Sequence, residues 1–164
     1  MSELFPESRP SWERDDHRLL RRHAAEFFAT EVTPHQDRWA KQHQVDRELW
    51  TKAGAAGLLC LEVAEGYGGS AGNLGHDAVV QQELVLAGDT AFGYGVHASI
   101  VTHYISAFGT EGQKKRWLPK LVTGESVIAI AMTEPGTGSD LQAVRTTAVR
   151  DGDDYVINGS KTFI

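Results

Sequence analysis

The segment A-M-T-E-P-G-T-G-S-D, residues 131–140, follows an apolar, β-branched run, V-I-A-I-A, and this succession decides how the chain divides. Such a run predicts a buried strand, and Pro135 fixes the direction in which the main chain leaves it. Gly136 and Gly138 permit backbone angles that turn successive N–H groups toward one point, a nest that suits a phosphate oxygen. The segment therefore predicts a ligand site at the end of a strand. The alternative is a tight turn capped by Asp140.

Three further side chains give this predicted site its character. Thr133 is the last residue of the expected strand, so its hydroxyl can meet the polar edge of a ligand. Ser139 adds a hydroxyl donor at the turn. Phe163 can present an aromatic face to a planar ring if its strand returns beside the first. Together they indicate a planar ligand that carries phosphate groups.

The chain before this segment has the apolar spacing of helices. The expected helix starts, at capping or turn residues, are Ser11, Asp46, Leu74, Thr90 and Thr110. Pro34 and Pro119 are expected to break or kink their helices, and Gly57 to stop one. Residues 1–125 therefore predict a helical domain.

Residues 126–164 consist of short, β-branched runs. Strands are expected over 127–132, 143–150, 155–157 and 161–164, with a turn at R-D-G-D-D and a two-residue hairpin at Asn158-Gly159. The expected fold class is α+β, in which the helical domain is followed by the start of a β-barrel-like domain over 126–164. Because an open sheet edge is rarely stable alone, we expect the chain to be a piece of a longer protein or its edge to be covered by partner subunits.

Composition excludes several classes of protein. The net charge is −6 with acids and bases interspersed, whereas nucleic-acid binding needs clustered basic residues. No apolar run approaches the roughly 20 residues that cross a bilayer. The N-terminus lacks the basic and apolar regions of a signal peptide, so a cytoplasmic location is expected.

Other candidate motifs favour structural roles. The single cysteine, Cys60, is expected to be a small buried residue rather than a nucleophile. The seven histidines show no metal-binding spacing, and no metal site is expected. The glycine-rich segment at Gly66, Gly68 and Gly72 lies between an apolar run and a helix, as in a dinucleotide fingerprint. No second strand or ribose-binding acid follows it, so a structural loop is favoured.

The sequence T-E-P-G-T-G-S-D-L-Q-A-V-R-T-T-A, followed by N-G-S-K-T-F-I, closely resembles the flavin-binding segment of acyl-CoA dehydrogenases. Two earlier segments, E-L-W-T-K-A-G-A-A-G-L-L and F-G-T-E-G-Q-K-K-R-W-L-P-K-L-V-T-G-E, are similar to the helical region of that family. The resemblance extends from about residue 18 to 164. V-A-E before the glycine-rich segment, and Phe at position 163, look most like the long-chain branch.

The resemblance implies FAD as the cofactor and an acyl-CoA thioester as the substrate. Main-chain and hydroxyl groups of Met132 and Thr133 are expected at the flavin ring, Gly138 and Ser139 at the diphosphate, and Phe163 against the isoalloxazine. The implied cofactor-binding set is Ile130, Met132, Thr133, Gly138, Ser139, Phe163 and Ile164. The implied substrate-binding set is Phe92, Gly93, Gly95 and Ser139, because the start of that helix forms one wall of the acyl pocket in the family.

The resemblance also implies which parts are absent. In the family, the catalytic glutamate lies in a C-terminal helical domain, which would follow Ile164, so no catalytic residue is expected within this chain. Glu134 lies inside the flavin segment, yet a structural role is expected for it. The whole protein is expected to be a fatty-acid-oxidising homotetramer that passes electrons to an electron-transferring flavoprotein. The alternatives are an acyl-CoA oxidase of the same fold and a catalytically silent helical interaction module.

Overall fold

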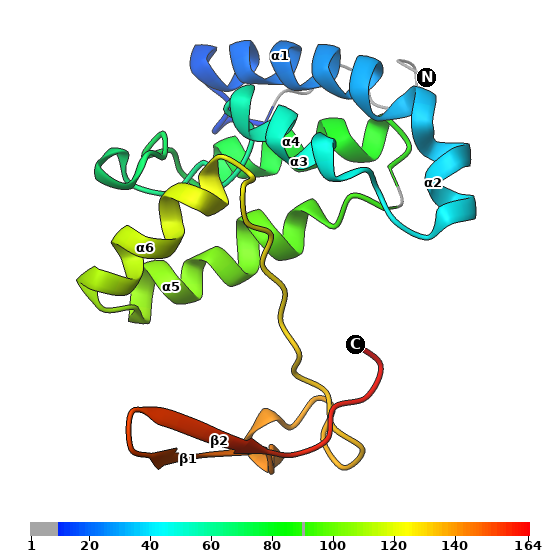
Figure 1. The fold of residues 1–164 in the computed structure, drawn as a ribbon. Coiled ribbons are helices and arrows are strands. Elements are labelled where there is room, and N and C mark those ends of the chain that lie inside the picture. Colours follow the sequence, from blue (N-terminus) through cyan, green and yellow to red (C-terminus); the bar gives the residue numbers. More distant parts are fainter. Residues whose placement is uncertain (1–9, 90) are drawn as a thin grey trace. The chain divides into compact units, whose positions relative to one another are not determined.

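The structure is a computed structural model that describes residues 10–89 and 91–164 (Figure 1). The expected helix start at Thr90 falls outside these ranges. The α-helices are α1 (Asp15–Glu31), α2 (Gln36–Gln42), α3 (Arg47–Ala55), α4 (Leu74–Leu86), α5 (Thr102–Phe108) and α6 (Glu111–Val122). A π-helix, η3, spans Gly95–Val101, and single turns of 3-10 helix are η1 (Thr33–His35), η2 (Glu65–Tyr67) and η4 (Leu141–Ala143). The strands are β1 (Thr147–Asp151) and β2 (Asp154–Asn158).

The chain forms two compact units, which divide between Ile128 and Ala129. The first unit is helical, and α1 packs along α4. Its core is apolar, and the largest fully buried side chains include Phe28, Trp39 and Phe92. The second unit contains the β-hairpin. The α+β fold class is therefore confirmed.

Several helix boundaries follow the local signals. The Thr110 hydroxyl accepts a hydrogen bond from the N–H of Gln113 at 3.3 Å, and the Gln113 side chain accepts one from the N–H of Thr110 at 2.8 Å. This reciprocal pair is a capping box. Asp46 precedes α3 as expected, although its carboxylate is bound by Arg38 instead of capping the helix.

Two helix expectations were wrong, and one of the two alternatives for Pro119, the end of its helix, is excluded. The first helix begins at Asp15 after an Arg14 cap, not at Ser11, because the His17 ring accepts the Arg14 N–H at 3.2 Å. Helix α6 continues through Pro119 to Val122. The expected regular helix over 90–108 is instead the π-helix η3 followed by α5. Among the described residues, no helix is both long and apolar enough to span a bilayer.

The β-hairpin confirms one turn and corrects another. Strands β1 and β2 pair antiparallel, with Val149 opposite Val156, and the turn between them contains Gly152 at a φ of 61°. This is the turn expected at R-D-G-D-D. By contrast, Asn158-Gly159 does not join two strands, because residues 161–164 form no ladder with β2. Gly159 instead lies against Thr146, whose Oγ1 would be 2.1 Å from a Cβ at that position.

Residues 127–132 are extended, but they are not a strand of any sheet in the described part of the chain. The expectation of a strand there was wrong because a strand requires a neighbouring ladder, which apolar, β-branched residues do not supply by themselves.

Candidate functional site

A tight turn follows residues 127–132. The N–H of Glu134 donates to the carbonyl of Thr137 at 3.0 Å, and the N–H of Thr137 donates back at 3.0 Å. Pro135 and Gly136 occupy the middle of this turn. Neither Gly136 nor Gly138 has a positive φ, so this turn does not use the left-handed backbone angles that glycine permits.

The carboxylate of Glu134 organises the turn. The side chain is buried, and its oxygens accept from the N–H of Arg145 at 2.8 Å and from the N–H and hydroxyl of Thr146 at 3.0 and 2.5 Å. The Lys161 ammonium lies 3.0 Å away. The Thr146 hydroxyl, followed by the other donors, lowers the pKa of Glu134 to about 2. A carboxylate held in this way is a poor proton acceptor, and its contacts are those of a structural residue.

Two contacts bring the last residues beside the start of the turn. The Lys161 ammonium donates to the carbonyl of Met132 at 3.0 Å, and the N–H of Thr162 donates to the carbonyl of Thr133 at 3.0 Å. Phe163 follows directly, with a φ of 54° and 96% of its surface exposed. Ile164 is also exposed. The phenyl ring is therefore an open aromatic face next to the predicted strand end.

Hydrogen-bond donors remain free on the other side of the turn. Within the described residues, the N–H groups of Gly138 and Ser139 have no protein acceptor, and both residues are exposed. The Asp140 carboxylate caps the following turn by accepting the N–H of Gln142 at 3.1 Å. A planar group that carries a phosphate fits this arrangement. The site offers the free donors, a half-buried Thr133 and the exposed ring of Phe163.

The other predicted residues lie in the helical unit. Phe92 is only 1% exposed, and its ring packs on Trp50 with 4.6 Å between centroids. Its side chain therefore belongs to the core. Gly93 is exposed and has a φ of 63°. A Cβ at Gly95 would lie 3.2 Å from the Gln81 side-chain oxygen, so this glycine allows a close approach of α4.

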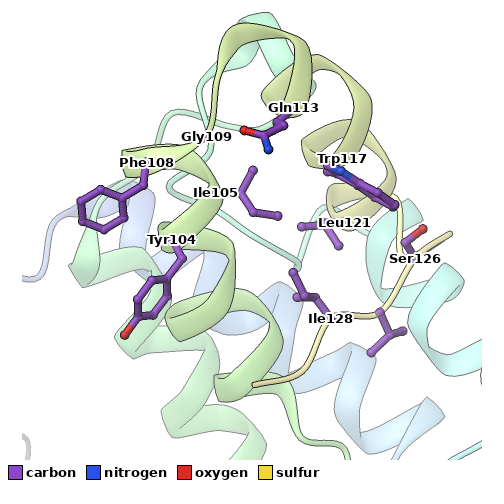
Figure 2. Close-up of a pocket in the computed structure, with 10 residues that line it drawn as sticks. Tyr104, Ile105, Phe108, Gly109, Gln113, Trp117, Leu121, Ser126 and Ile128 are labelled. Atoms are coloured by element: carbon purple, nitrogen blue, oxygen red, sulfur yellow. The ribbon is translucent and has the colours of Figure 1, made fainter. Parts of the chain in front are cut away.

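The helical unit also carries an apolar cavity of about 520 Å³, which sequence reasoning missed (Figure 2). The side chains of Ile105 on α5, Leu121 on α6 and Ile128 converge on it, whereas Phe108 points away. Phe92, Gly93 and Gly95 do not line it. The helical spacing of Trp117 and Leu121 could have indicated part of the cavity lining. No pattern in the sequence indicated that the segment over 126–128 closes one side of the cavity.

Two polar clusters were also unforeseen. Asp16, His17 and His76 lie together at the starts of α1 and α4. The Nδ1 atoms of His17 and His76, however, accept the N–H groups of Arg14 and Asn73, both at 3.2 Å. These two lone pairs therefore already cap the helices. The second cluster joins Cys60, His97 and Thr102 in the core.

Cys60 is buried as expected, and burial raises the pKa of its thiol to about 11. The glycine-rich segment before α4 is a loop that contains η2, with no strand in front of it. A Cβ at Gly69 would lie 2.0 Å from the Val63 carbonyl oxygen, so this loop folds tightly on its own main chain. The loop is therefore not the first turn of a nucleotide-binding unit.

Comparisons with known proteins agree with this arrangement. The chain is 46% identical over 149 residues to the long-chain specific acyl-CoA dehydrogenase of Sus scrofa, covering 91% of this chain and 35% of that protein. It superimposes on an acyl-CoA dehydrogenase from Geobacillus kaustophilus with a TM-score of 0.89 at 46% identity, covering 94% of this chain and 41% of the other. A Bacillus anthracis acyl-CoA dehydrogenase complexed with FAD gives a TM-score of 0.84 at 36% identity, with 93% and 27% covered.

The chain thus spans about a third of the length of its curated relatives, 35% for the pig enzyme. Family models describe the same two parts that the structure shows. The acyl-CoA dehydrogenase N-terminal domain matches residues 14–125, and the acyl-CoA dehydrogenase middle domain matches residues 129–164. On this evidence, the chain belongs to the acyl-CoA dehydrogenase family.

Proposed function

We propose that this chain is the N-terminal portion of an FAD-dependent acyl-CoA dehydrogenase, which oxidises the Cα–Cβ bond of an acyl-CoA thioester to a trans-2-enoyl-CoA. The observation that supports it best is the exposed Phe163 ring beside Thr133, with free N–H donors at Gly138 and Ser139. This arrangement occurs in a chain of a family whose members include an enzyme complexed with FAD.

In this proposal, FAD supplies the acceptor for the hydride that leaves Cβ while a carboxylate base takes the α-proton. The residues of this chain bind and orient. Phe163 provides a face for the ring, Thr133 offers its hydroxyl to the ring edge, and Gly138 and Ser139 donate to the diphosphate. Ile130, Met132 and Ile164 complete the cofactor set.

Glu134 does not serve as the base, because its carboxylate already accepts four hydrogen bonds and its pKa is lowered. The proposed base is a glutamate beyond Ile164. A substrate wall starts at Gly93 and Gly95 and continues along the exposed side chains of Val96 and Ile100. Ser139 is also proposed to contact the CoA arm. We further propose a cytoplasmic homotetramer that delivers electrons to an electron-transferring flavoprotein.

A chimera tests the proposal, because the chain covers only part of its relatives. Residues 14–164 replace the matching part of the Geobacillus kaustophilus relative, and the purified chimera is examined for flavin absorption. Long-chain acyl-CoA is then added without oxygen. The proposal predicts retained flavin whose visible absorption is bleached by substrate. A chimera that folds but holds no flavin, or whose flavin is not bleached, contradicts it. In a parallel assay with oxygen present, rapid oxygen consumption would indicate an oxidase instead.

A further inference from the structure

His97 occupies a central place in the helical unit. It lies in the π-helix η3, is only 1% exposed, and its ring meets the Trp50 ring edge-on with 4.9 Å between centroids. The Thr102 hydroxyl donates to the His97 carbonyl at 2.6 Å, across five residues, and this bond closes the wide turn. Wide turns of this kind are uncommon inside helices and are frequent at functional sites.

The two ring nitrogens of His97 have different partners. Nδ1 accepts the main-chain N–H of Ile128 at 3.2 Å. Nε2 lies 3.1 Å from the carbonyl of Leu121, near the end of α6, to which it donates. Burial lowers the pKa of His97, which favours the neutral ring. Because Nδ1 accepts from Ile128, the proton lies on Nε2. One side chain therefore holds both the end of α6 and the extended segment that follows it.

The hydrogen bond that the N–H of Ile128 donates to His97 has no counterpart among the neighbouring residues of the extended segment. Of the main-chain N–H groups of residues 127–133, only that of Ile128 donates to an acceptor in the described part of the chain. Ile128 is the last residue of the helical unit and lies two positions before Ile130. The main chain two residues before Ile130 is thus held through one imidazole nitrogen.

We propose that His97 is a positioning residue for flavin binding, which acts by holding the main chain at Ile128 through Nδ1. This inference rests on the proposed function. His97 touches neither cofactor nor substrate in this account. A purely structural histidine would stabilise the core through both nitrogens, and its loss would lower the stability of the fold without a separate effect on FAD affinity.

The two nitrogens can be separated by substitution. In His97→Asn, the amide oxygen takes the place of Nδ1 and keeps the acceptor for Ile128. In His97→Gln, the amide nitrogen takes the place of Nε2 and keeps the donor for Leu121, but no acceptor faces Ile128. His103→Gln is a matched control, because His103 on α5 is partly exposed and its one ion pair among the described residues is with Glu62, at 3.5 Å.

The substitutions are made in the chimera described above, and its flavin-free form and these variants are titrated with FAD and followed by thermal unfolding and amide hydrogen exchange. For His97→Gln we expect the FAD dissociation constant to rise by about tenfold, with faster exchange at Ile128. For His97→Asn we expect affinity within about twofold of wild type, even if its unfolding temperature falls. His103→Gln should leave the FAD affinity and the unfolding temperature unchanged.

Equal weakening of FAD binding in the two His97 variants, or no weakening in either, would overturn the inference, because affinity would then not follow Nδ1. Failure of the unsubstituted chimera to bind FAD would instead overturn the proposed function, and with it this inference. The two failures are distinguishable, since only the second is seen without any substitution.

Discussion

The helical unit and the β-hairpin unit are stabilised in different ways. In the helical unit, large apolar side chains such as Phe28, Trp39 and Leu118 are almost completely buried. In the second unit, all residues of β1 and β2 are exposed, and the buried side chains are those of Glu134 and Thr137. Apolar burial therefore holds the first unit, whereas hydrogen bonds that converge on one carboxylate hold the second.

This difference matters for function because ligand sites need free polar groups near a rigid support. The second unit keeps Gly138, Ser139 and Phe163 open to solvent, while Glu134 fixes the turn beside them. Variants that affect one unit and not the other test this comparison.

The largest effect is expected from Phe28→Ala. The ring is fully buried in the helical core, so its loss should destabilise that unit by about 3–5 kcal/mol. All four tryptophans lie in the helical unit, so denaturant unfolding followed by their fluorescence measures this change. Leu19→Ala on the same helix is the control, because Leu19 is 60% exposed and should cost at most about 0.5 kcal/mol. Equal effects of the two substitutions would refute an apolar core at this position.

A smaller loss is expected from Gly124→Ala. Gly124 has a φ of 70°, and a Cβ there would lie 2.1 Å from the Trp50 carbonyl oxygen. Such strain costs about 1–3 kcal/mol. Gly136→Ala is the matched change in the second unit, where a Cβ meets no atom within 4 Å, and about 0.5 kcal/mol or less is expected. Thermal unfolding of both variants measures the contrast, and a larger cost for Gly136→Ala would reverse it.

Glu134→Gln should act on the second unit alone. The amide keeps the shape of the side chain, but its NH2 group is a donor that faces the donors of Arg145, Thr146 and Lys161. At least one hydrogen bond of the carboxylate is therefore lost. Amide exchange at Arg145 and Thr146 should become faster, while tryptophan fluorescence of the helical unit stays unchanged. Unaltered exchange at both amides would show that the carboxylate does not organise this unit.

Lowering the pH should weaken the same hydrogen bonds of Glu134 in the wild-type chain. Folding lowers the pKa of Glu134 from 4.5 to about 2, so between these values the unfolded chain binds more protons than the folded unit. The stabilisation is complete above pH 4.5 and is lost as the pH falls toward 2. Amide shifts of Arg145 and Thr146 across this range, compared with those of Glu134→Gln, measure it. A midpoint near 4.5 would mean that the carboxylate is not held in the folded unit.

Local signals predicted the fold well where a few neighbouring residues decide it. The Thr110 capping box and the turn at Gly152 are examples. Predictions failed where distant residues decide the outcome. The His17 ring moved the first helix start away from Ser11, and the Thr146 side chain, not a hairpin, accounts for Gly159.

The candidate site divides in the same way. Sequence motifs placed Thr133, Gly138 and Ser139 at one turn, because those residues are close in the chain. The return of the chain beside Thr133 was only a condition of the prediction for Phe163, and the hydrogen bond from Thr162 to Thr133 supplies that return. The cavity at Ile105, Leu121 and Ile128, and the anchoring of Ile128 by His97, depend on packing between segments that no local pattern encodes.

The most direct test of the account is an FAD titration of the isotopically labelled 164-residue chain, followed by amide resonances. The account predicts that the largest shifts lie at Met132, Thr133, Gly138, Ser139 and Phe163, with the amides of α1 unchanged. Shifts confined to the helical unit at saturating FAD would contradict the assignment of the flavin site to this turn.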